Sequence, residues 1–189
     1  MFEGYHQPQH HVSMRDGLPV ALRPTLLEEA ESDWRNHPRY AGKARFFMNI
    51  HRQLIDGSAQ LAKALEQLSD TPENEVKDRL RAMNLLAGAD HLINFAHRHH
   101  EIEDHGYFPQ FIRLYPQLER ALSLMDSDHD ILETALHGTE AGLRSLKQGN
   151  VNRDTLMLLH KDAKALNKVL ERHITDEEEV IIPIFLRHG

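Results

Sequence analysis

Residues 99–109 read His-His-Glu-Ile-Glu-Asp-His-Gly-Tyr-Phe-Pro, and residues 173–183 read His-Ile-Thr-Asp-Glu-Glu-Glu-Val-Ile-Ile-Pro. Aligned on the proline, both stretches follow the pattern His-x-x-x-Glu-acid-x-x-apolar-apolar-Pro. Because residues four apart lie on the same face of an α-helix, each histidine and the glutamate four residues later present an imidazole and a carboxylate to one point. The two pairs are His99 with Glu103 and His173 with Glu177. Such a pair suits a first-row metal such as iron, manganese or zinc.

The second copy decides between overlapping registers in the first. Other His-x-x-x-acid pairs begin at His97 and at His100, but only the pair that begins at His99 matches the C-terminal copy. His99 also continues an apolar face, three and four residues after Ala96 and Phe95. We therefore expect His99 to point inward, and His97 and His100 to lie on flanking or solvated faces.

Composition describes an ordinary globular protein that forms one domain. Of its 189 residues, 40% are hydrophobic and 27% are charged, and the formal net charge is −7. The acidic balance and the lack of a basic stripe argue against a nucleic-acid partner. Because the chain has no cysteine, disulfides, thiolate zinc sites and iron–sulfur clusters are excluded within it.

Membrane and export signals are also absent from the sequence. No apolar run approaches the roughly 18 residues that a membrane span needs, and the first 17 residues lack the apolar segment of a signal peptide. We expect a cytoplasmic protein with no membrane partner, which exists as a monomer or a homodimer and could act through an unidentified protein partner.

Four long helices are predicted, because apolar residues recur every three or four positions in four segments. The expected ranges are 40–69, 72–106, 116–146 and 154–182. Short connections and the lack of alternating strand patterns predict an all-α fold, an up-down-up-down antiparallel four-helix bundle in a domain spanning residues 39–189.

Residues 1–38 are rich in proline and form a partly irregular N-terminal extension. A short helix is expected at residues 25–34. His6, His10 and His11 lie in the least patterned part, where we expect a solvated tail.

Histidine is the unusual residue of this chain, at 15 of 189 positions. Two of these histidines, His51 and His129, lie in the middle of apolar helix faces. A lone histidine of this kind is often only a hydrogen-bonded core residue. Here each one precedes a His-x-x-x-Glu pair, by 48 residues in one half and 44 in the other. Since neighbouring helices run antiparallel, each lone histidine can reach the level of the pair on the next helix. We therefore favour a role of His51 and His129 as metal ligands.

Six residues of this kind suit two metal ions. His51 and His99 would hold one ion, and His129 and His173 would hold the other. Glu103 and Glu177 could bridge them, which leaves open positions for a small ligand. Nitrogen and oxygen ligands permit iron, manganese or zinc. Glu133 and His100 remain open as extra ligands.

The sequence resembles the hemerythrin-like, or HHE cation-binding, domains from about Tyr40 to Gly189. The resemblance rests on the two His-x-x-x-Glu stretches with their following acids and prolines, and on the two lone histidines. It implies a four-helix bundle with a non-haem di-iron centre bridged by two carboxylates. Invertebrate relatives carry O₂, and bacterial ones are associated with O₂ sensing, nitric oxide or peroxide responses, and iron–sulfur repair.

This chain departs from the oxygen carriers in two places. They have a second histidine four residues from the first on the third helix, where this chain has Met125 and Glu133, and they use His-x-x-x-x-Asp on the fourth. Both differences favour the bacterial type. The missing cysteine weakens a role in iron–sulfur repair.

Two functions follow from these observations. The first is a di-iron protein that binds or reacts with O₂, NO or peroxide in a bacterial oxygen or stress response or in iron handling. The second is a non-redox metal-binding or sensing domain that acts through a partner. Zinc or manganese is possible in the purified protein.

Overall fold

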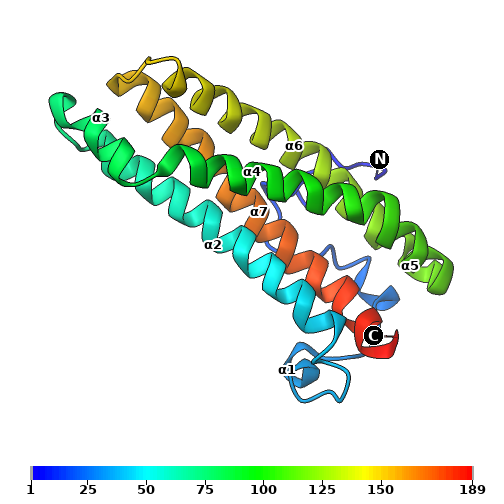
Figure 1. Ribbon diagram of the computed structural model, residues 1–189. Helices are drawn as coiled ribbons and strands as arrows, with labels where there is room; N and C mark the ends of the chain where they lie inside the picture. Colours follow the sequence, from blue (N-terminus) through cyan, green and yellow to red (C-terminus); the bar gives the residue numbers. More distant parts are fainter. Residues whose placement is uncertain (1, 189) are drawn as a thin grey trace. The chain divides into compact units, whose positions relative to one another are not determined.

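The computed structural model describes residues 2–188, and these residues form helices without any strand (Figure 1). The α-helices are α1 (Glu31–Trp34), α2 (Lys43–Ser69), α3 (Glu73–Ala82), α4 (Leu85–Ile102), α5 (Phe108–Leu114), α6 (Glu119–Lys147) and α7 (Arg153–His188). Two short 3₁₀-helices, η1 (Arg23–Thr25) and η3 (Pro116–Leu118), and one π-helical turn, η2 (Glu103–Tyr107), complete the order. None of the described helices is long and apolar enough to cross a membrane. Met1 and Gly189, the outer limits of the two predicted domains, lie outside the described residues.

The chain divides into two compact units. The first comprises Met1–Gln53, His100–Ile131 and Glu171–Gly189, and the second comprises Leu54–His99 and Leu132–Leu170. Helix α2 leads from the first unit to the second, α4 returns, α6 leads out again and α7 returns. Successive long helices therefore alternate in direction, which confirms the predicted up-down-up-down order.

The second unit has an aliphatic core. Its leucines on α2 recur at helical spacing and are at most 6% exposed: Leu54, Leu61, Leu65 and Leu68. Burying a leucine side chain stabilises the fold by about 1.5–3 kcal/mol, so these four side chains are a main favourable contribution to the docking of the segment. The hydroxyl of Ser58, on the same helix, donates a hydrogen bond of 2.8 Å to Asn167.

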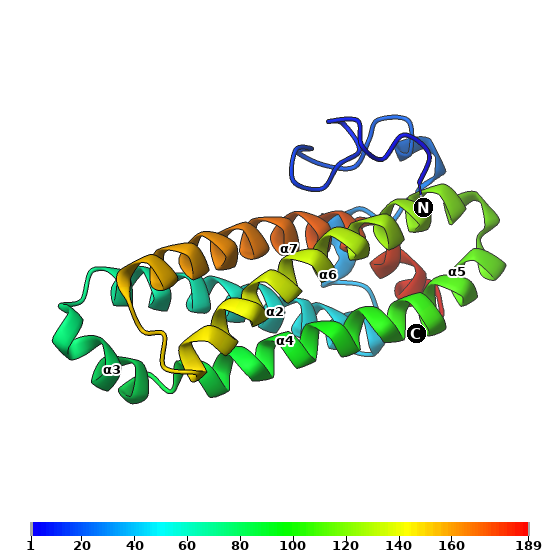
Figure 2. The ribbon, with the colours of Figure 1, turned by 90° about the horizontal axis from the view of Figure 1, so that it is seen from above.

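The predicted helix at 72–106 is not continuous, which corrects the sequence-based boundary. It is divided into α3 and α4, and Figure 2 shows α3 as a separate short helix between α2 and α4. The break lies at Asn84, whose φ of 48° is in the left-handed region. Asparagine tolerates that region better than most residues, but the sequence pattern carries no marker of it.

The N-terminal extension contradicts the expectation of a solvated tail. Phe2, Tyr5, Leu18 and Leu22 are buried and belong to the apolar core of the first unit. Helix α1 covers only four residues of the expected 25–34 range. Because the buried side chains follow no helical or strand period, sequence periodicity could not reveal that the segment packs.

Candidate metal centre

Helix α4 passes directly into the π-helical turn η2 at Glu103. Turns of this kind, which insert one extra residue into a helix, occur frequently at functional sites. Glu103 is fully buried although it carries a carboxyl group, and the first unit buries Glu177 of α7 to the same extent. Two buried carboxyl groups stay ionised together only with a positive partner close by.

Three imidazoles form one group in the first unit. They belong to His100, His129 and His173, and one nitrogen from each lies within 4.8 Å of the others. The rings of His100 and His129 stack with centroids 4.4 Å apart, and the Nε2 atoms of His129 and His173 are 3.2 Å apart. All three side chains are buried, so their nitrogens converge on one enclosed point.

A second group in the same unit contains His51, Glu103 and Glu177, with ligand atoms again within 4.8 Å of one another. Nε2 of His51 lies 3.4 Å from Oε2 of Glu177 and 3.9 Å from Oε1 of Glu103. The other oxygen of Glu103 lies 3.7 Å from Nε2 of His129, and Glu177 Oε2 lies 3.7 Å from Nε2 of His173. Each glutamate thus faces an imidazole of both groups.

His99 is the last residue of Leu54–His99, the first of the two segments that form the second unit. It lies in the last turn of α4, four residues before Glu103 of η2, and its side chain is buried.

Carboxylates hold the outer nitrogens of three histidines. The Nδ1–carboxylate distances are 3.0 Å from His51 to Glu178, 2.7 Å from His129 to Asp104 and 3.2 Å from His173 to Asp128. Because a carboxylate accepts a hydrogen bond, each Nδ1 carries a proton, and in the neutral ring the Nε2 lone pair is then directed to the centre. Metal-binding histidines have this arrangement as a rule, so the residues present fit a metal of the iron, manganese or zinc type.

Sequence reasoning missed these orienting carboxylates, although one signal was visible. Asp104 and Glu178 each follow the inward glutamate in the repeated stretch, so the Glu-acid doublet pairs an inward carboxylate with an outer one. Asp128 carries no such signal, because it only precedes His129 in the sequence.

His100 does not lie on the flanking or solvated face that the sequence pattern predicted. It is 2% exposed and belongs to the three-imidazole group. The corresponding residue of the second copy is Ile174, which is 1% exposed, so an apolar residue at that position was the missed signal. Glu133 lies in the second unit, where its carboxylate pairs with Nδ1 of His97 at 2.8 Å.

A comparison with protein families matches residues 43–185 to the hemerythrin HHE cation binding domain. The chain belongs to this family. Neither the comparison with curated proteins nor that with solved structures found a match. The matched part of this hemerythrin-family protein spans both copies of the repeated stretch and both lone histidines, and it excludes the N-terminal extension.

The imidazoles of this HHE domain hold protons tightly when no metal competes. Burial lowers the pKa of His51, but Glu103 and Glu178 outweigh it and raise the pKa to about 10. Burial also lowers the pKa of His129, and the hydrogen bond to Asp104 together with the charge of Glu103 raises it to about 9. Both rings are therefore protonated at neutral pH in the metal-free protein.

The pKa values of the buried carboxyl groups shift in two directions. Burial and the neighbouring Glu177 raise the pKa of Glu103 to about 7, and burial raises that of Glu177. Burial raises the pKa of Asp128 as well, but hydrogen bonds from Arg15 and His173 outweigh it and leave the pKa below its ordinary value. Protons thus occupy the centre of the HHE domain, and a cation would replace them.

Aromatic side chains border the HHE centre. Phe108 stacks on His129 at a centroid distance of 5.6 Å, and Phe47 meets His51 edge-on at 5.9 Å. A hollow of about 270 Å³ is lined by Asp104, Phe108 and residues of α5 and α6, so it reaches the carboxylate that holds His129.

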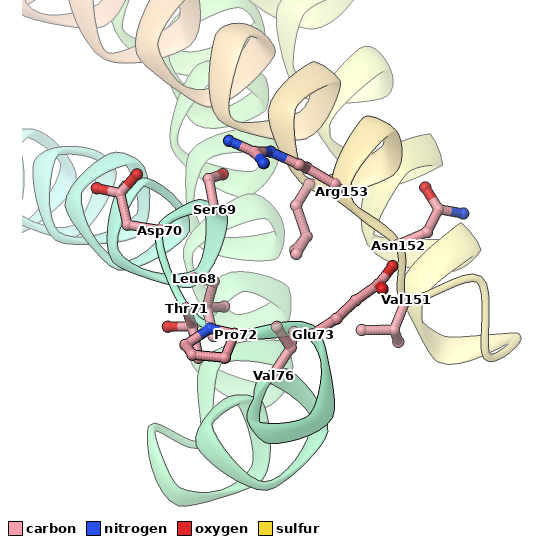
Figure 3. A pocket seen from close by; sticks show the side chains of 11 residues that line it. Leu68, Ser69, Asp70, Thr71, Pro72, Glu73, Val76, Val151, Asn152 and Arg153 are labelled. Atoms are coloured by element: carbon pink, nitrogen blue, oxygen red, sulfur yellow. The ribbon is translucent and has the colours of Figure 1, made fainter.

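A larger hollow, of about 410 Å³, lies in the second unit between the α2–α3 turn and the start of α7 (Figure 3). Its lining includes Asp70, Glu73 and Arg153 but no histidine. It is therefore not a candidate for the metal centre.

Proposed function

We propose that this hemerythrin-family protein holds two iron ions and binds or reacts with O₂, NO or peroxide. The observation that carries the proposal is that three histidines each have Nδ1 on a carboxylate and Nε2 directed to the centre. The proposed ligands are His51, His99, Glu103 and Glu177 for one ion, and His100, His129 and His173 with the same two glutamates for the other.

His99 is included because it lies in the last turn of α4, four residues before Glu103, the first residue of η2. Glu103 and Glu177 are proposed as bridges because each faces imidazoles of both groups. The group around His51 has fewer imidazoles than the other, so it leaves positions for a small ligand.

Iron, when bound, supplies the one-electron chemistry and the affinity for diatomic ligands. The chain's own residues do the remaining work. Glu178, Asp104 and Asp128 fix the ring orientations and the tautomers of three histidines. The aromatic rings of Phe47 and Phe108 limit the access of water, and the hollow beside Asp104 gives a small molecule an approach to this side of the centre.

Metal analysis with optical spectroscopy tests the proposal. The full chain is loaded with ferrous iron without oxygen, and spectra are recorded before and after exposure to air, dithionite, azide, NO and peroxide. About two irons per chain with a near-ultraviolet band that these reagents change would support it. Metal-dependent stability with no response to any of them would favour a non-redox sensing domain that acts through a partner.

A role in a bacterial oxygen or stress response, or in iron handling, belongs to this proposal, as does a cytoplasmic location. Co-purification from cells exposed to NO or peroxide would identify a partner if the protein signals.

A further inference from the structure

The N-terminal extension places one buried cation near the metal centre. Arg15 precedes the family match, which begins at residue 43, yet its side chain is only 1% exposed. Its guanidinium binds both oxygens of Asp128, with 2.8 Å from Nη1 to Oδ1. It also donates from Nε to Asp176 at 2.7 Å and from Nη1 to the carbonyl of His10 at 2.6 Å.

Asp128 connects Arg15 to His173, one of the proposed metal ligands. Its carboxylate accepts hydrogen bonds from Arg15, from the hydroxyl of Tyr5 at 2.6 Å, and from Nδ1 of His173 at 3.2 Å. Asp128 is completely buried, and both Arg15 and Tyr5 come from the extension. Two parallel bonds from a planar guanidinium fix the plane of a carboxylate, which a single ammonium group cannot do.

We propose that Arg15, assisted by Tyr5, is a positioning residue of the metal centre: it holds Asp128 against His173 and so fixes the orientation of that imidazole. The inference rests on the proposed function, because it requires His173 to bind a metal. It extends the centre beyond the matched domain, since residues 5 and 15 lie outside it.

A purely structural role would make Arg15 an anchor for the extension. The contacts argue for more. Asp176 keeps a second cationic partner, Arg172, if Arg15 is removed, whereas Asp128 would retain, among the described residues, only Tyr5 and His173. Loss of Arg15 therefore acts mainly on the carboxylate that orients His173.

Cobalt binding by the full chain tests the inference without any redox reaction. We expect Arg15→Met to bind Co²⁺ about 10- to 100-fold more weakly than wild type and to change the visible spectrum of the bound ion. Arg15→Lys should give an intermediate affinity, because lysine keeps the positive charge but cannot donate two parallel hydrogen bonds to Asp128. Arg23→Met is the matched control. Arg23 also joins the extension to α7, through an exposed ion pair with Glu179 at 3.2 Å.

A double-mutant cycle separates positioning from anchoring. If Arg15 acts through Asp128, Arg15→Met should weaken Co²⁺ binding less than threefold in an Asp128→Asn background. Equal losses in both backgrounds would overturn the inference, as would an Arg15→Met affinity and spectrum equal to those of Arg23→Met. If Arg15→Met does not fold, Tyr5→Phe replaces it in the cycle, with an expected loss of about two- to tenfold.

The two proposals fail in different ways. A wild-type chain that binds no Co²⁺ would overturn the metal centre and this inference together. If the wild type binds Co²⁺ and Arg15→Met does not change its affinity or spectrum, only the inference is overturned. A wild type that binds Co²⁺ but, loaded with iron, does not respond to O₂, NO or peroxide would overturn the gas-binding function alone.

Discussion

Metal loading should expel protons from the centre, and the number of protons released follows from the pKa values of the buried groups. His51 has a pKa of about 10, His129 of about 9 and Glu103 of about 7 in the metal-free protein. At pH 7 both rings are protonated and Glu103 is about half protonated. A metal needs the Nε2 lone pairs and the carboxylate, so loading both groups at pH 7 should release about two to three protons.

The same exchange sets the pH dependence of affinity. Protons compete with the metal below the metal-free pKa values, so affinity rises with pH and levels off only above about pH 9–10. Between pH 7.5 and 8.5 Glu103 is mostly ionised, which leaves about two protons from His51 and His129. The overall affinity for metal should therefore tighten by about 100-fold over that pH unit.

Zinc titrations of the metal-free chain provide the assay. Proton release is measured in lightly buffered solution with an indicator dye, and by calorimetry in two buffers of different ionisation enthalpy. Glu178→Gln should reduce the release near pH 9, because His51 loses one of the carboxylates that raise its pKa. His105→Gln is the control, since this exposed side chain only contacts the carbonyl of Glu101. Release of less than one proton at pH 7, with an affinity independent of pH, would refute the reasoning.

Three further outcomes are expected. Asp104→Asn should weaken Zn²⁺ binding about 10- to 100-fold because it removes the charge that holds His129, whereas Asp126→Asn, in the same hollow, should change it less than threefold; equal effects would contradict the assigned role. In α6, Gly138→Ala should raise the free energy of unfolding by about 0.5–1 kcal/mol, since a methyl group there meets nothing within 4 Å. Gly142→Ala should lack that gain or lower stability by about 1–3 kcal/mol, because its methyl group would lie 2.8 Å from a leucine side chain of α7; chemical denaturation distinguishes the two. Zinc at about 1,000 times its dissociation constant should stabilise the fold by about 4 kcal/mol and raise the unfolding temperature, and a chelator should reverse this, whereas an unchanged unfolding temperature would argue against a native-state metal site.

The all-α fold and the family follow from local patterns. The four apolar stripes and the repeated His-x-x-x-Glu stretch have helical spacing. Such spacing can be recognised in a sequence, because the face of a helix on which a residue lies depends only on its position. The break at Asn84 and the π-helical turn at Glu103 were not predictable in this way, because they depend on how the neighbouring helices pack.

Local patterns predict four long amphipathic segments, their alternation and a repeated set of histidines and glutamates suited to a metal. Which of these residues meet depends on the tertiary packing. It placed His100 with His129 and His173, and it brought Arg15 of the extension to Asp128. These contacts join residues up to 113 positions apart in the chain. No local period links such residues, because their proximity depends on the packing of whole helices and of an irregular segment that buries its own apolar side chains.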